Sequence, residues 1–166
     1  MLKLGIELFI PLILSNTLHL FVIKYNLLCF LKLPVHATLF GQNKTYRGFI
    51  FVSISNGIIQ LILNFFLYQH FSTESFILGT ILGLVYMFSE LPNSLFKRKM
   101  GIMSGEKPKK NAWLFTILDK ADSTFGVTIV FAIIKSLSII SFFIFYLLAF
   151  IVHLSICLLY TSDAAD

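Results

Sequence analysis

The sequence predicts an all-α, polytopic membrane protein with about five transmembrane helices. Two observations support this fold class. Of the 166 residues, 57% are hydrophobic and only 13% are charged, a composition far from that of soluble globular domains. Several stretches also approach or reach the roughly 20 apolar residues that a helix needs to cross the hydrocarbon core of a bilayer. The length of the chain suits one domain.

The expected spans follow one another along the chain. The first three cover residues 4–23, 48–68 and 76–96. After residue 121 we expect two more, over residues 121–134 and 137–156, with a break at Lys135 and Ser136; one long span is the alternative. The first span lacks a small-residue cleavage site, so we expect it to be retained. In the third span, Gly79 and Gly83 have the spacing that permits close helix packing.

The basic residues predict the orientation of these spans. With five helices, two loops on the same side hold eleven of the 13 Lys and Arg residues: Lys24, Lys32, Lys44, Arg47, Lys97, Arg98, Lys99, Lys107, Lys109, Lys110 and Lys120. Lys3 and Lys135 remain for the opposite side. By the positive-inside rule, we expect both loops in the cytoplasm and the N-terminus outside.

Asp119 and Asp122 are candidates for binding a metal ion. On a helix, residues three apart share one face, so the two carboxylates repel each other unless a cation neutralises them. Mg²⁺ is typically held by one or two carboxylates together with substrate phosphates. The alternative is a solvated helix start, where acidic side chains are favourable against the helix dipole. Because the pair lies beside an apolar run and near a basic loop, we interpret it as a metal site.

A polar stripe ends the third expected span and consists of Glu90, Ser94, Lys97 and Arg98. An ionisable residue inside a span is costly and points to a functional site. Pro92 is expected to loosen the helix here because it has no backbone N–H. For Lys97 and Arg98 the alternative is ordinary anchoring at the membrane edge.

A second polar segment precedes the second expected span. Between Gly41 and Gly48 stand an amide, two cations and a hydroxyl, namely Asn43, Lys44, Thr45 and Arg47. Such groups suit the oxygens of a phosphate. The segment is not a Walker A loop, because the Gly-Lys-Ser/Thr order is absent.

The histidines and cysteines form no recognisable motif. The four histidines, His19, His36, His70 and His153, do not have the spacing of metal ligands. Cys29 and Cys157 suggest neither a disulfide framework nor a zinc site. We therefore assign none of these residues a direct role.

Taken together, three motifs resemble the CDP-archaeol synthase family. They are Gly41-x-Asn43-Lys44-Thr45-x-Arg47-Gly48, Glu90-x-Pro92-Asn93-Ser94-x-x-Lys97-Arg98-x-x-Gly101-Ile102-x-x-Gly105, and Asp119-x-x-Asp122-Ser123. The likeness runs from about residue 39 to residue 126 in family order, and parts of it are similar to the phosphatidate cytidylyltransferase signature. The second motif looks closer to bacterial members. The resemblance implies five membrane helices and a charged cavity on the cytoplasmic side.

The resemblance also implies a reaction and roles for single residues. CMP would pass from CTP to a membrane lipid phosphate, giving a CDP-lipid and pyrophosphate, with Mg²⁺ required. Asp119 and Asp122 would be catalytic metal ligands, and Lys97 and Arg98 would be catalytic by neutralising the triphosphate. Substrate binding and support of the cavity would fall to the other motif residues: Asn43, Lys44, Thr45, Arg47, Glu90, Asn93, Ser94 and Ser123.

The expected partners follow from this reaction. They are CTP, a lipid phosphate and the bilayer of the cell membrane; nucleic acid is not expected, and a homodimer is left open. An unsaturated archaetidic-type phosphate and phosphatidic acid are both compatible with an apolar wall. Two rival functions use the same residues differently: a CTP-dependent lipid-alcohol kinase, and a non-enzymatic scaffold or transporter subunit.

Two features depart from the family pattern. Lys120 stands where related chains often carry Gln, and the added cation could strengthen phosphate binding. Residues 157–166 look like the translation of a sequencing adapter, so we expect a single cytidylyltransferase domain over residues 1–156.

Overall fold

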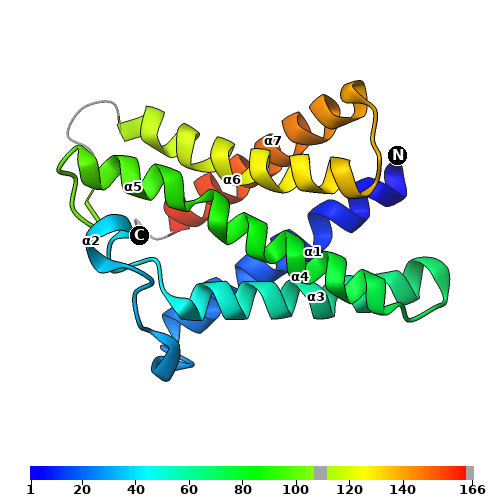
Figure 1. The fold of residues 1–166 in the computed structure, drawn as a ribbon, viewed down its shortest axis with the longest axis horizontal. Helices are drawn as coiled ribbons and strands as arrows, with labels where there is room; N and C mark the ends of the chain where they lie inside the picture. The colour runs from blue at the N-terminus through cyan, green and yellow to red at the C-terminus, as the bar shows by residue number, and fades with distance from the viewer. Residues whose placement is uncertain (107–111, 164–166) are drawn as a thin grey trace.

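The computed structural model describes residues 1–106 and 112–163, and the regular structure in these ranges is helical (Figure 1). The long helices are α1 (Leu2–Lys24), α3 (Tyr46–Tyr68), α4 (Thr73–Ser89), α6 (Ala112–Ile134) and α7 (Ile139–Asp163). The shorter elements are the 3-10 turn η1 (Cys29–Leu31), α2 (Ala37–Phe40) and α5 (Leu91–Lys99). The all-α prediction is therefore confirmed.

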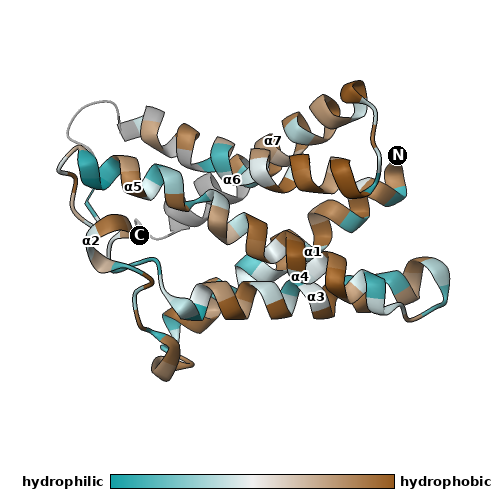
Figure 2. Ribbon diagram, viewed as in Figure 1, coloured by the Kyte–Doolittle hydropathy of each residue, from teal (hydrophilic) through white to brown (hydrophobic). Residues whose placement is uncertain are grey.

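The described helices also support a multi-pass membrane protein. Among the described residues, Leu2–Lys24, Tyr46–Tyr68 and the continuous segment Thr73–Lys99 are long and apolar enough to cross a bilayer. Ile139–Ser155 forms a further, shorter apolar helix. Figure 2 shows hydrophobic residues along these helices and hydrophilic residues at the end of α5.

Two boundaries differ from the sequence-based expectation. The fourth expected span was to begin at residue 121, but α6 begins at Ala112, because residues 112–118 are largely apolar and contain neither Gly nor Pro. The third expected span, residues 76–96, is divided at Glu90 into α4 and α5. Pro92 stands in the first turn of α5, where its missing N–H costs no hydrogen bond. The predicted break at Lys135 and Ser136 is confirmed.

The helices pack in the order α1, α3, α4, α6 and α7, with α4 between α3 and α6 (Figure 1). The α3–α4 contact is the closest. A Cβ atom added to Gly79 would lie 2.6 Å from the Asn56 carbonyl oxygen, and one added to Gly83 would lie 2.8 Å from the Ser53 Cα atom. The Asn56 side-chain amide donates a 2.6 Å hydrogen bond to the Gly79 carbonyl. The packing role predicted for the two glycines is confirmed.

Gly79→Ala is expected to destabilise the protein by about 1–3 kcal/mol, because the added methyl group meets the backbone of α3 and forces the helices apart. The measurement is the midpoint of thermal unfolding in detergent. Gly5→Ala is the matched control, since a Cβ atom there lies an ordinary 3.4 Å from the Phe145 ring. Equal midpoints for the two variants would contradict the close α3–α4 packing.

A buried ionic cluster joins three elements at the end of the bundle where α1 begins. Glu7 is only 3% exposed. Its Oε1 atom accepts a 2.8 Å hydrogen bond from the Tyr68 hydroxyl, and its Oε2 atom lies 2.8 Å from the Lys135 Nζ atom. The cluster therefore links α1 to the end of α3 and to the turn that follows α6.

Candidate active site

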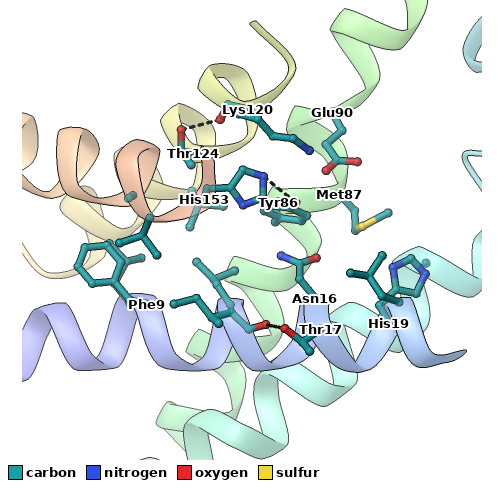
Figure 3. Close-up of a pocket in the computed structure, with 18 of the residues that line it drawn as sticks. Phe9, Asn16, Thr17, His19, Tyr86, Met87, Glu90, Lys120, Thr124 and His153 are labelled. Carbon is teal, nitrogen blue, oxygen red and sulfur yellow. Dashed lines mark hydrogen bonds between the residues drawn. The ribbon is translucent and has the colours of Figure 1, made fainter. Parts of the chain in front are cut away.

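A cavity of about 320 Å³ lies among α1, α4, α6 and α7, below the segment that precedes α3 (Figure 3). Its two ends differ in chemistry. One end carries the charged side chains of Lys44, Glu90 and Lys120. The remaining wall is mainly apolar and includes Leu8, Phe9, Leu12, Val127 and Val152. The cavity is thus amphipathic along its length.

The charged end is built around an ion pair between Lys44 and Glu90. Their side chains are 18% and 14% exposed, respectively. Figure 3 shows the Lys120 side chain extending toward the Glu90 carboxylate from the opposite wall. Two cations around one carboxylate leave a net positive charge, which suits an anionic ligand.

Local structure places both members of this pair. Glu90 lies at the junction of α4 and α5. Lys44 lies in a segment closed on itself: its carbonyl accepts a 2.8 Å hydrogen bond from the Val35 N–H, and Tyr46 N–H donates to the Leu33 carbonyl at 3.0 Å. The lysine is therefore fixed just before α3 begins.

The structure divides the first sequence motif. Asn43 and Lys44 line the cavity, as expected of substrate-binding residues. Thr45 and Arg47 are 8% and 5% exposed and are not among the lining residues. The Arg47 Nη1 atom donates a 3.1 Å hydrogen bond to the Leu27 carbonyl, so its visible role is to hold the segment after α1 against α3.

The second motif is divided as well. Asn93 and Ser94 are buried on α5, and the Ser94 hydroxyl donates a 3.0 Å hydrogen bond to the Glu90 carbonyl. Lys97 is half-buried. Arg98 does not line the cavity; it faces a separate depression of about 490 Å³.

That depression lies between α2 and the residues after α5. Gly41, Gln42 and Ser104 line it together with Arg98. The Nε and Nη1 atoms of Arg98 are buried and have no hydrogen-bond partner within residues 1–106 and 112–163. An unpaired buried guanidinium is costly, so this site is suited to an anion. Gly41 has φ +87°, and a Cβ atom there would lie 2.9 Å from the Ser104 hydroxyl, so glycine is required.

The third motif lies inside α6 and not at a helix start. Asp122 is half-buried and Ser123 is fully buried, with the Ser123 hydroxyl donating to the Lys120 carbonyl at 3.3 Å. The side chain of Asp119 lies outside the described part of the chain. The described residues contain no group of three or more His, Cys, Asp or Glu side chains arranged for a metal. The continuous helix nevertheless gives Asp119 and Asp122 the same face, which fits a two-carboxylate Mg²⁺ site completed by substrate phosphates.

Comparison with known families decides the assignment. Residues 8–162 match the family model for CDP-archaeol synthase (CarS-like). The chain belongs to this family. No curated protein and no solved structure matches it. The family match includes residues 157–162, and the assignment of residues 157–166 as an adapter stays a prediction.

The CDP-archaeol synthase family consists of CTP-dependent cytidylyltransferases, so this chain is an enzyme of that class. Membership confirms the resemblance inferred from the three motifs. It also implies synthesis of a CDP-lipid from CTP in a membrane.

Sequence reasoning missed several polar residues of the cavity wall. Asn16, Tyr86 and His153 line the cavity, on α1, α4 and α7, respectively. Tyr86 precedes Glu90 by four residues and Thr124 follows Lys120 by four, so a search for polar residues one helical turn from the motifs would have found both. The sequence around His153 carries no comparable signal.

Proposed function

We propose that this CDP-archaeol synthase family member transfers CMP from CTP to a membrane lipid phosphate at the cavity between α1, α4, α6 and α7. The observation that carries this proposal is the polarity of the cavity: cations at one end and an apolar wall at the other. That arrangement fits an amphiphile whose phosphate meets Lys44 and Lys120 while its chains lie among Leu8, Phe9 and their neighbours.

The proposed reaction needs little covalent chemistry from the protein. An oxygen of the lipid phosphate attacks the α-phosphorus of CTP, the bond between the α- and β-phosphates breaks, and pyrophosphate leaves. Such transfers depend mainly on positioning and on neutralising charge. Lys44 and Lys120 would neutralise the lipid phosphate, and Glu90 would hold the Lys44 ammonium in place through their ion pair. No general base is needed, because a lipid phosphate is anionic at neutral pH.

The nucleotide phosphates would bind nearer Arg98. Its two unpaired buried nitrogens provide hydrogen bonds that a phosphate oxygen can accept. Lys97 is next to it on α5 and would add a second positive charge. Asn43 lines the cavity and directly follows Gln42, which lines the depression. Thr45, Arg47, Asn93, Ser94 and Ser123 would support this arrangement from buried positions.

Asp119 and Asp122 would hold a magnesium ion on the same face of α6. When bound, the ion supplies positive charge that stabilises the triphosphate and the leaving pyrophosphate. The family relationship favours this metal, since nucleotidyltransferases of this type are typically Mg²⁺-dependent.

We further propose five transmembrane spans: α1, α3, the α4–α5 segment, α6 and α7. Two of these spans, α3 and the α4–α5 segment, separate the segment before α3 from the segment after α5, so both segments lie on the same side. These two segments hold most of the basic residues, so the charged end of the cavity would face the cytoplasm, where CTP is available. The N-terminus would then lie outside.

The test is product analysis with purified protein in detergent, CTP and Mg²⁺. An unsaturated archaetidic-type phosphate and phosphatidic acid are offered in parallel. Release of pyrophosphate that depends on a lipid phosphate is the expected result. A lipid alcohol is offered in a third assay, and release of CDP in that assay would instead identify a kinase. The absence of any nucleotide turnover would favour a non-enzymatic scaffold or transporter subunit. The chain is assayed as it stands and with residues 157–166 replaced by the corresponding segment of a family member, so that an inactive tail is recognised.

A further inference from the structure

The cavity contains a layer of hydrogen-bonding side chains between its charged end and its apolar end. Tyr86 lies one helical turn from Glu90 on α4, and Thr124 lies one turn from Lys120 on α6, which places both about 5.4 Å deeper along their helices. Asn16 on α1 and His153 on α7 complete the layer. Figure 3 shows the side chains of Asn16, Tyr86 and His153 directed into the same part of the cavity.

The threonines that line the cavity use their hydroxyl hydrogens within their own helices. Thr124 donates to the Lys120 carbonyl at 2.7 Å, Thr128 to the Thr124 carbonyl at 2.7 Å, and Thr17 to the Ile13 carbonyl at 2.8 Å. These hydroxyls therefore offer no free donor to a ligand. Donors must come from elsewhere in the layer.

Asn16 is one source of donors. Its side chain lines the cavity, and its amide has no hydrogen-bond partner among the residues that the structure describes. The half-buried side chain opens onto the cavity, so its amide hydrogens are available to a ligand. A ligand oxygen in the middle of the cavity would accept a hydrogen bond from this amide.

His153 is a second source. Its Nε2 atom lies 3.4 Å from the Tyr86 hydroxyl oxygen, and the two rings meet edge-on. Which of the two groups donates depends on the tautomer of the histidine. In the tautomer that carries its proton on Nε2, the histidine donates and the Tyr86 hydroxyl oxygen accepts. At 3.4 Å this bond is long, so a ligand oxygen can compete for the same hydrogen.

Resting on the proposed function, we propose that Asn16 and His153 bind the glycerol-backbone oxygens of the lipid phosphate and that Tyr86 positions His153. With the phosphate at Lys44 and Lys120, those oxygens follow within a few bonds and reach the next turn of the helices. A simple polyprenyl phosphate has no oxygen at that depth. Because a site built to hydrogen-bond a ligand oxygen rejects an analogue that lacks this oxygen, the layer makes the enzyme selective for glycerol-linked lipid phosphates.

The test compares a glycerol-linked lipid phosphate with a polyprenyl phosphate of similar apolar length. Two measurements are made on each variant: KM for the lipid and for CTP, and the rise in thermal midpoint that the lipid causes without CTP. For Asn16→Leu and His153→Phe we expect the KM of the glycerol-linked lipid to increase roughly threefold to tenfold, with the KM of CTP unchanged. The KM of polyprenyl phosphate should be the same for these variants as for the unaltered enzyme, so the selectivity for the glycerol-linked lipid falls.

Conservative and distant variants complete the design. His153→Gln keeps a donor and should retain more selectivity than His153→Phe. Tyr86→Phe should reduce selectivity less than loss of His153, because it removes only the positioning contact. Tyr146→Phe and His70→Gln, which lie outside the cavity lining, are the matched controls and should behave like the unaltered protein.

The outcomes separate this inference from the proposed function. Unchanged selectivity in Asn16→Leu and His153→Phe, or equal changes in the KM of CTP and lipid, would overturn it. If the enzyme forms no CDP-lipid but glycerol-linked phosphates still raise its thermal midpoint through Asn16 and His153, the proposed reaction fails and the binding inference stands. Thermal midpoints measured without ligand identify any variant that has lost its fold. If His153→Phe or Asn16→Leu has done so, the selectivity of His153→Gln decides instead.

Discussion

Asp122→Asn is expected to lower the rate of CDP-lipid formation by roughly a hundredfold to a thousandfold, a loss comparable to removal of a group that stabilises transition-state charge. The substitution keeps the size of the side chain but removes its negative charge. A neutral amide is a poorer Mg²⁺ ligand than a carboxylate, so the Mg²⁺ concentration needed for half-maximal activity should also increase. Pyrophosphate release measured over a range of Mg²⁺ concentrations checks both effects.

Two other acid-to-amide substitutions make this result specific. Asp119→Asn should behave like Asp122→Asn, because both residues lie on the same face of α6. Glu74→Gln is the matched control, since Glu74 is exposed in the first turn of α4 and lies outside the cavity lining. Near-normal activity and unchanged Mg²⁺ dependence in Asp122→Asn would refute the metal assignment.

Lys44→Met is expected to lower kcat/KM for the lipid phosphate by roughly a hundredfold, because the phosphate loses its nearest cation in a mainly apolar cavity. The variant should also be less stable than the unaltered protein. Its Glu90 carboxylate would remain largely buried with its ion-pair partner removed, which is a costly state. Activity assays and thermal unfolding in detergent measure the two effects separately.

The double variant Lys44→Met/Glu90→Gln separates structure from catalysis. Removing both charges should restore much of the stability that Lys44→Met loses, since no unpaired carboxylate remains. Activity should stay low, because the cation is still missing. Recovery of both properties together would show that Lys44 acts through Glu90 alone and does not contact the phosphate. Lys24→Met, an exposed lysine at the end of α1, is the control for a general loss of positive charge.

The fold could be predicted largely from hydropathy because the spans are long and their connections are polar. The start of α6 could not, since the apolar residues 112–118 follow the basic loop directly and the charged residues Asp119, Lys120 and Asp122 interrupt the apolar run. The division at Glu90 was indicated by Pro92, whose ring and missing N–H have a known effect on the helix.

The candidate site was predicted less completely. Glu90 could be singled out because an ionisable residue inside a span is costly. Lys44 could be singled out because it stands with other polar residues between Gly41 and Gly48. Arg47 looks equivalent to Lys44 in the sequence, yet three residues further on, in the first turn of α3, its side chain donates to the Leu27 carbonyl. His153 could not be predicted at all, because its position in the cavity depends on how α7 packs against α4 and α6.

The Glu7 cluster has a consequence for how this protein is made. Glu7 enters the membrane with the first helix, long before Lys135 leaves the ribosome. During that interval its carboxylate is without its later partner, and a lone charge in a bilayer is unfavourable. The first helix would therefore remain beside the insertion machinery until the turn after α6 arrives. Completion of this cluster would mark the moment when the early and late parts of the protein are joined in the bilayer.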